Sequence, residues 1–185
     1  MTTAITLLDL RVAQWFHAHA FEPLTSFMLG VSLLHSTAGA LLLAAGFALY
    51  LWRRAARRWL LALLLSVPGG MLLNVLLKYV FQRSRPVFEH PLVTLASYSF
   101  PSGHTVAATL LYGVLASYLV TERRQAAALV VPPSVLMVLL VAASRVYLGA
   151  HYLSDVLAAM AEGVAWLALC ITATSAWRRR LPAAP

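Results

Sequence analysis

Three separated segments of the chain carry basic, hydroxyl and imidazole side chains at the edges of long apolar stretches. Arginine recognises phosphate oxygens through paired hydrogen bonds, and lysine supplies a movable point charge. Three cations with few acidic neighbours therefore predict a site for an anionic group such as phosphate. The residues of these segments that could do chemistry are Lys78, Arg85, Ser102, Gly103, His104, Arg145, His151 and Asp155.

The two histidines suit group-transfer chemistry. His151 and Asp155 are four residues apart, so on a helix they would share one face. The carboxylate could then hold the proton on Nδ1 and leave a lone pair on Nε2, and an oriented neutral imidazole is a nucleophile. His104 supplies a second imidazole for general acid catalysis. Ser102 and Gly103 precede a helix, whose N-terminal N–H groups bind anions.

Membrane-spanning helices are expected to position these residues. The 185 residues are 61% hydrophobic and 11% charged, with a mean hydropathy of +0.79, whereas soluble domains are about 25% charged. This composition excludes a disordered chain, a coiled coil and an ordinary cytosolic enzyme. A helix needs roughly 20 apolar residues to cross the bilayer core. Apolar runs of suitable length occupy residues 23–52, 59–77, about 102–121, 125–144 and 156–177.

We therefore predict an all-α, polytopic membrane helix bundle of five or six transmembrane helices with an N-terminal amphipathic helix. Residues 1–22 are expected to form this helix at the membrane interface, because apolar residues recur there at steps of three and four. The sixth span applies if this helix inserts. Residues 23–177 are the expected membrane-embedded catalytic domain, and residues 178–185 a cytoplasmic basic tail. The run 23–52 is long enough to tilt or to begin as an interfacial segment.

The net charge of +8 divides between the two sides of the membrane. Lys78, Arg83, Arg85 and Arg145 fall on one side. The larger set follows the first, third and fifth apolar runs, and the positive-inside rule places it in the cytoplasm. This distribution argues against nucleic acid as a partner. The cytoplasmic set is Arg53, Arg54, Arg57, Arg58, Arg123, Arg124, Arg178, Arg179 and Arg180.

The motifs resemble a known signature. The strings K-x6-R-P at 78–86, P-S-G-H at 101–104 and S-R-x5-H-x3-D at 144–155 are similar to the three-part signature of the type 2 phosphatidic acid phosphatase superfamily. The hydropathy resembles its membrane lipid-phosphatase branch. The resemblance implies a reaction through a phosphohistidine, without a metal or other cofactor.

The resemblance also implies a role for each residue. His151 would attack phosphorus, Asp155 would orient His151, and His104 would protonate the leaving oxygen and then activate water. The remaining residues would hold the phosphoryl oxygens and stabilise the transition state: Lys78, Arg85, Ser102, Gly103 and Arg145.

The expected activity is hydrolysis of a phosphomonoester or diphosphate of a membrane lipid, at the periplasmic face of a bacterial inner membrane. The small size and the short loop 82–101 resemble the compact undecaprenyl diphosphate phosphatases of the family, so undecaprenyl diphosphate is the first expectation. The alternative is a broad-specificity phosphatidic acid or phosphatidylglycerol phosphate phosphatase. The non-enzymatic alternative is a membrane lipid transporter or binding protein, which would more often show inverted repeats. The expected partners are the lipid substrate and the bilayer, and the oligomeric state stays open.

Five other residues receive separate interpretations. Arg83 is interpreted as a loop charge or a contact to a lipid headgroup. His35 lies inside the first apolar run and is expected to bond a neighbouring helix. Glu162 and Asn74 could face the site, since an ionisable residue within a span is a functional candidate. Cys170 is the single cysteine, expected to be buried or lipid-facing.

Overall fold

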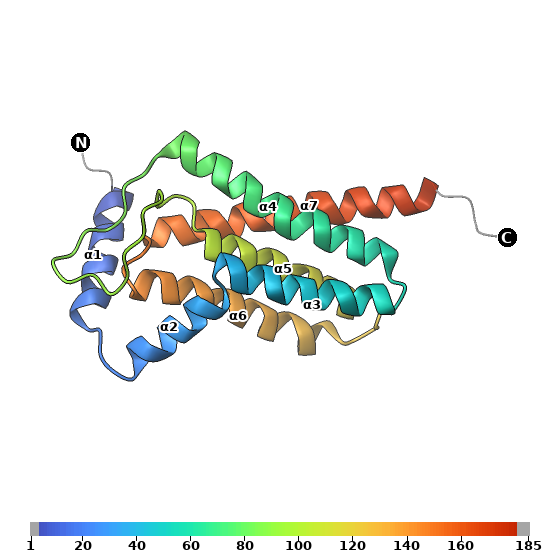
Figure 1. Cartoon of the computed structure of the whole chain (residues 1–185), viewed down its shortest axis with the longest axis horizontal. Helices are drawn as coiled ribbons and strands as arrows, with labels where there is room; N and C mark the ends of the chain where they lie inside the picture. Colours follow the sequence, from blue (N-terminus) through green and yellow to red (C-terminus); the bar gives the residue numbers. More distant parts are fainter. Residues whose placement is uncertain (1–3, 181–185) are drawn as a thin grey trace.

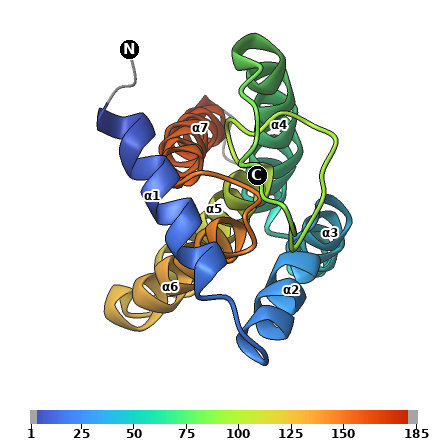
Figure 2. The same cartoon turned by 90° about the vertical axis from the view of Figure 1, so that its left-hand side faces the viewer.

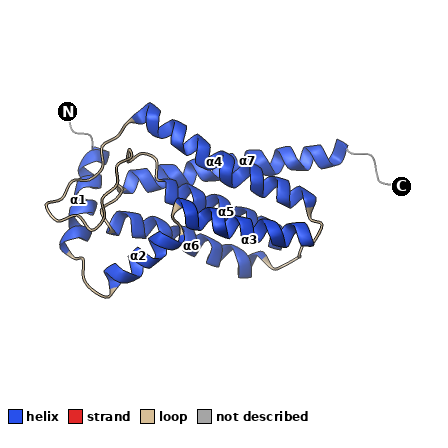
Figure 3. Cartoon of the chain, viewed as in Figure 1, coloured by secondary structure: helices blue, strands red, loops and turns tan. Residues whose placement is uncertain are grey.

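The computed structural model describes residues 4–180, with side chains as far as Trp177. Within this range every regular element is a helix and there is no strand (Figures 1 and 3). The all-α prediction is confirmed. The helices are α1 (Ala4–Ala18), α2 (Leu24–Leu34), α3 (Thr37–Arg53), α4 (Arg57–Phe81), α5 (Gly103–Thr121), α6 (Ala127–Tyr147) and α7 (Leu153–Arg180).

The bundle has the length and apolarity of a polytopic membrane protein. Four helices are long and apolar enough to cross a membrane, namely α4, α5, α6 and the part of α7 from Leu153 to Trp177. The pair α2 and α3 makes a fifth candidate span, bent by 56°. Helix α1, of 15 residues, is not among the candidates and lies across one end of the bundle (Figure 2). The predicted bundle is confirmed with up to five candidate spans.

The run 23–52 is not one continuous helix, because it breaks at His35 and Ser36. The Oγ of Ser36 accepts a hydrogen bond from the backbone N–H of Gly39 at 3.2 Å, which caps the start of α3. A serine at this position satisfies one of the N–H groups that a helix start leaves free. Apolar composition alone does not reveal such a break.

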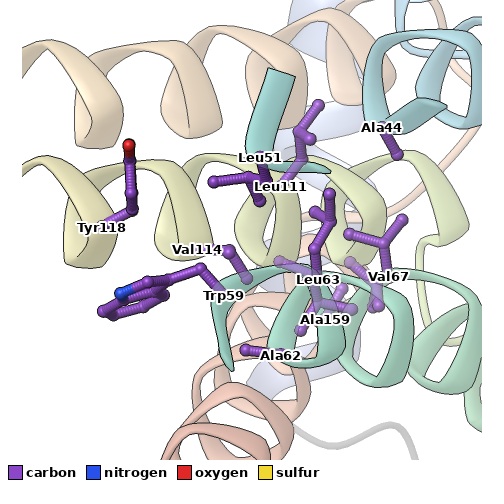
Figure 4. Close-up of a cluster of buried hydrophobic side chains, with 12 residues drawn as sticks. Ala44, Leu51, Trp59, Ala62, Leu63, Val67, Leu111, Val114, Tyr118 and Ala159 are labelled. Carbon is purple, nitrogen blue, oxygen red and sulfur yellow. The ribbon is translucent and has the colours of Figure 1, made fainter. Parts of the chain in front are cut away.

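Helix α5 lies at the centre of the bundle and packs against α3, α4, α6 and α7. Its side chains Val106, Leu110 and Val114 are fully buried, as expected for a helix that is apolar on most of its faces. They join a cluster that includes Leu51 of α3 and Leu63 of α4 (Figure 4). Because α5 is held on all sides, its N-terminus is a rigid place for a site.

Helix α1 covers the end of the bundle at which the predicted site residues lie. Val12 and Phe16 of α1 pack against a buried cluster that contains Val146 of α6 and Val156 of α7. The predicted interfacial segment 1–22 thus contains a helix that ends at Ala18. At the other end of the chain, α7 continues into the predicted tail 178–185 as far as Arg180, and residues 181–185 lie outside the described residues.

Candidate active site

A cavity of about 770 Å³ opens at the end of the bundle between α3, α4, α5 and the loop after α4. Three of the predicted site residues, Ser102, Arg145 and Asp155, are buried and do not line it. Asn74 and His35 also contribute to its wall. The predicted site residues that line the cavity are Lys78, Arg85, Gly103, His104 and His151.

A tight turn at the end of α6 positions His151. Gly149 adopts a φ of +67°, a conformation that glycine reaches without a steric penalty. The N–H of Gly149 donates to the carbonyl of Val146, and the N–H of Ala150 donates to the carbonyl of Arg145. These two bonds form a Schellman motif. His151 therefore precedes α7 in a loop, and the expectation that His151 and Asp155 share one helix face is wrong.

The contacts of the His151 ring define its tautomer. Its Nε2 lies 3.2 Å from Nη1 of Arg85. Because arginine only donates hydrogen bonds, Nε2 must accept, and the ring proton is on Nδ1. Nδ1 faces Oδ2 of Asp155 at 3.5 Å. Burial lowers the pKa of His151 to about 4, against the opposing effect of Asp155, so the ring is neutral near pH 7 with its lone pair on the side of Arg85.

The carboxylate of Asp155 is fully buried and has hydrogen-bond partners on both oxygens. Oδ2 accepts from the backbone N–H of Tyr152 at 2.9 Å and from the hydroxyl of Ser99. Oδ1 accepts from Nη1 of Arg83 at 2.5 Å. A buried carboxylate needs such partners to remain ionised. Asp155 is thus fixed in orientation beside His151.

The start of α5 supplies the backbone donors of the cavity. Ser102 is the N-cap residue, and its own N–H donates to the carbonyl of Asp155 at 3.2 Å. Gly103 and His104 follow in the first turn, where N–H groups have no partner within the helix. A Cβ on Gly103 would lie 3.3 Å from Oδ1 of Asn74. The glycine therefore lets the start of α5 lie close to α4.

Lys78 and Arg85 hold the loop after α4 against the cavity. Nζ of Lys78 donates to the carbonyl of Tyr98 at 2.8 Å. Arg85 donates to the carbonyls of Ser97 at 2.7 Å and Ala150 at 2.6 Å. Burial lowers the pKa of Arg85, and the charge of Asp155 opposes this effect. These hydrogen bonds to loop carbonyls thus fix both cations at the cavity wall.

Arg145 lies outside the cavity wall. Its side chain is 2% exposed, and Nη1 donates to the hydroxyl of Ser32 on α2, while Nε has no partner. The structure therefore shows Arg145 as a link between α6 and α2. The described part of the chain contains no group of three or more His, Cys, Asp or Glu side chains placed to hold a metal ion.

Arg83, interpreted as a loop charge or a headgroup contact, lies in the loop after α4, and its guanidinium is paired with acids of the protein itself. Its guanidinium pairs with Asp155 at 2.5 Å and with Asp9 of α1 at 2.8 Å. Sequence reasoning also missed Asp9, which is buried and bonded to Ser154. The only available signals were an acidic residue in the apolar face of α1 and an arginine inside the first motif.

The other interpretations concern residues of the bundle, of which Cys170 is buried as expected. His35 bonds a neighbouring helix as expected, since its Nε2 lies 2.8 Å from the hydroxyl of Tyr112 on α5. Asn74 lines the cavity, and its Nδ2 donates to Oε2 of Glu162 at 3.1 Å. Glu162 therefore supports a cavity residue without lining the cavity itself.

Comparison with known proteins gives consistent matches. The profile of a family described as the PAP2 superfamily matches residues 59–179. Phosphatidylglycerophosphatase B of Bacillus subtilis is 36% identical over 128 residues. This alignment covers 67% of the chain and 61% of the relative, so the chain spans less than two thirds of that protein's length.

Two solved structures share the fold. The first is the crystal structure of a transmembrane PAP2-type phosphatidylglycerolphosphate phosphatase from Bacillus subtilis, with a TM-score of 0.80 and 29% identity, covering 97% of this chain and 90% of that one. The second is Aquifex aeolicus LpxE, with a TM-score of 0.72 and 19% identity, covering 89% of this chain and 95% of that one. At this identity the second structure supports the fold alone.

Proposed function

The chain belongs to the PAP2 superfamily, and from this premise we propose that it is a multi-pass membrane lipid phosphatase. The observation that carries the proposal is the cavity in which Nε2 of the neutral His151 ring lies beside Arg85, with Lys78 and His104 in the same wall. A nucleophile, two cations and a second imidazole around one cavity are the groups that phosphoryl transfer from a lipid requires.

The first step is attack of Nε2 of His151 on phosphorus. The bond from phosphorus to the leaving oxygen breaks as the bond to nitrogen forms, and His104 gives its proton to that oxygen. Asp155, held 3.5 Å from Nδ1, stabilises the positive charge that develops on the His151 ring. Lys78, Arg85 and the N-terminal N–H groups of α5 offset the negative charge on the phosphoryl oxygens.

The second step returns the enzyme to its starting state. His104, now without its proton, takes one from a water molecule as the water attacks the phosphohistidine. The phosphorus–nitrogen bond breaks, inorganic phosphate leaves, and His151 recovers its lone pair. Two steps with one covalent intermediate replace a single difficult displacement by water.

The lipid tail of the substrate is proposed to stay in the bilayer. One wall of the cavity is formed by side chains of α4 that are also exposed on the outside of the bundle, among them Leu72, Val75 and Tyr79. Exposed apolar residues on a candidate span face lipid. A headgroup could therefore enter sideways between α3 and α4 without the acyl chains leaving the membrane.

We propose phosphatidylglycerol phosphate as the substrate in preference to undecaprenyl diphosphate. The printed names of the Bacillus subtilis relative and of the first solved structure both refer to phosphatidylglycerol phosphate. These names support the alternative raised from the sequence more than the first expectation. The resemblance to compact undecaprenyl diphosphate phosphatases rested on size and loop length, which do not describe the headgroup.

The proposed orientation directs the cavity to the periplasm of a bacterial inner membrane. The opposite end of the bundle gathers Arg54, Arg57, Arg58 and Arg123 around a second cavity. A cluster of arginines next to membrane spans marks the cytoplasmic side. The catalytic end then faces away from the cytoplasm.

A substrate panel with the purified protein in detergent tests the proposal. Phosphate release is measured from phosphatidylglycerol phosphate, phosphatidic acid and undecaprenyl diphosphate, with His151→Ala as the blank. His90→Ala, in the exposed loop, is the matched control. We expect the highest kcat/KM on phosphatidylglycerol phosphate, no turnover by His151→Ala and normal turnover by His90→Ala. Turnover by His151→Ala at the wild-type rate would contradict the proposed reaction, and a preference for undecaprenyl diphosphate would contradict the proposed substrate.

A further inference from the structure

The buried carboxylate of Asp9 on α1 makes contacts that the proposed reaction does not use. Asp9 is 2% exposed. Its Oδ1 accepts from the backbone N–H of Ser154 at 2.9 Å, and its Oδ2 accepts from the Ser154 hydroxyl at 2.5 Å. Oδ2 also accepts from Nη2 of Arg83 at 2.8 Å. An acidic side chain is rarely so buried without a specific partner, and here every partner lies at the first turn of α7 or in the loop after α4.

Arg83 connects this carboxylate to the one that orients His151. Its Nη1 donates to Oδ1 of Asp155 at 2.5 Å and to the Ser154 hydroxyl at 2.7 Å, while its Nη2 donates to Asp9. The guanidinium also lies over the ring of Tyr152, 4.4 Å from its centroid. Burial acts to lower the pKa of Arg83, but the hydrogen bond to Asp9 and the charges of both carboxylates raise it overall.

The two carboxylate oxygens of Asp155 contact different residues. Oδ1 binds Arg83, and Oδ2 faces Nδ1 of His151. The planar guanidinium forms its hydrogen bonds in a rigid fork, so a carboxylate on each nitrogen fixes its plane. A fixed plane for Arg83 holds Oδ1 of Asp155, while Tyr152 and Ser99 hold Oδ2, and together they set the rotation of the carboxylate. Without Asp9, the guanidinium, whose side chain is 28% exposed, keeps its contacts to Asp155 and Tyr152 but loses the second carboxylate that fixes its plane.

We propose that Asp9 is a positioning residue, which acts through Arg83 and Ser154 to hold Asp155 in the orientation that supports attack by His151. Helix α1 is then part of the catalytic assembly, although it contributes nothing to the cavity wall. This inference rests on the proposed function, because it concerns turnover at the same site.

Helix α1 has a separate means of docking, which makes the role of Asp9 testable. Val12 and Phe16 pack against the ends of α6 and α7. Asp9→Asn keeps the shape of the side chain and an oxygen that can accept the Ser154 N–H. It removes the negative charge and places an NH2 group, which cannot accept a hydrogen bond, opposite Nη2 of Arg83. Glu22→Gln is the matched control, because Glu22 is an exposed acid just after α1 whose hydrogen bonds go to Ser26.

The experiment measures kcat and KM for phosphate release from a short-chain phosphatidylglycerol phosphate, together with thermal unfolding in detergent. We expect Asp9→Asn to lower kcat by up to about 100-fold, the loss typical of a misplacement of about 1 Å at a reacting group. KM should match that of Glu22→Gln, whereas the unfolding temperature should be lower, because the substitution breaks a buried ion pair. Asp9→Glu, which restores the charge, should recover part of the lost kcat. A purely structural role would lower the unfolding temperature and the amount of folded protein but leave kcat per folded enzyme unchanged.

Two results would overturn the inference without touching the proposed function. The first is an Asp9→Asn variant with wild-type kcat in an assay where His151→Ala is inactive. The second, which needs no turnover, is additivity of Asp9→Ala and Arg83→Ala in thermal unfolding, since residues in one network are expected to be non-additive. Equal rates for wild type and His151→Ala on every lipid would instead refute the proposed function. Thermal unfolding of the two single variants and the double variant would still decide whether Asp9 and Arg83 are coupled.

Discussion

Replacing Gly149 by alanine is expected to destabilise the turn that holds His151. Gly149 has a φ of +67°, which costs an alanine roughly 1–2 kcal/mol. A Cβ at this position would also lie 2.8 Å from Cε2 of the Phe88 ring. Phe88 stacks on His17 with ring centroids 4.1 Å apart, so it cannot move away freely. Overpacking of this kind costs about 1–3 kcal/mol, which gives a total loss of about 2–5 kcal/mol.

The two causes can be separated by a second substitution. Phe88→Ala removes the ring, so Gly149→Ala in that background should cost only the backbone part, roughly 1–2 kcal/mol. Gly46→Ala is the matched control, because Gly46 lies in α3 with no atom within 4 Å of an added Cβ. In a helix this change is expected to stabilise by up to about 1 kcal/mol.

Thermal unfolding in detergent and phosphate release together provide the assay. Gly149→Ala should unfold at a lower temperature than wild type, and its kcat should fall because the Schellman turn no longer presents His151 correctly. An unfolding temperature equal to that of Gly46→Ala would refute the backbone argument. A cost that is the same with and without Phe88 would show that the ring is not the obstacle.

Three further predictions concern His151, Glu162 and Gly70. Because burial lowers the pKa of His151 from 6.5 to about 4, the unfolded chain takes up a proton that the folded chain does not. The contribution of His151 to the free energy of unfolding should therefore be fully present above pH 6.5 and fall by about 3 kcal/mol toward pH 4. Unfolding of His151→Gln, measured against pH, should lack this contribution. Glu162→Gln should unfold like wild type because it can still bond Asn74, whereas Glu162→Leu should lose about 1–3 kcal/mol in the same assay. Gly70→Ala should cost about 1–3 kcal/mol, since its Cβ would overlap Cδ1 of Leu110; no loss, or a loss that persists in Leu110→Ala, would contradict this packing.

Much of the cavity could be predicted because its residues lie in short motifs with strong local meaning. A lysine, an arginine and a histidine next to apolar runs must lie near the membrane boundary. The pair Ser102 and Gly103 indicates the start of a helix. The structure places these residues around or beside one cavity. The assignment of catalytic and binding roles to them stays a prediction.

The supporting contacts could not be predicted, because they join residues that are distant in the chain. Asp9 and Ser154 are 145 residues apart and meet only when α1 docks on α7. No spacing rule connects an acid in an amphipathic helix to a loop arginine such as Arg83. Tertiary packing also decided where His151 lies, since a turn at Gly149 and not a helix brings it to Asp155.

The break at His35 and Ser36 was hidden for a different reason. The run 23–52 is uncharged, and hydropathy does not distinguish one long helix from two bent ones. The serine cap is a weak signal in a sequence with many serines and threonines. The capping rule for serine could have located this break, but the uninterrupted apolar composition of the run favoured a single span.

The central claim is that His151 carries the phosphoryl group, and covalent trapping tests it most directly. The purified protein is mixed with phosphatidylglycerol phosphate labelled in its terminal phosphate and quenched with base, under which a phosphohistidine survives. Trypsin cleavage after Arg145 and Arg178 yields a peptide whose sole histidine is His151. We predict label on this peptide in wild type and none in His151→Ala. Rapid phosphate release with no label on the peptide, undiminished in His151→Ala, would contradict the account.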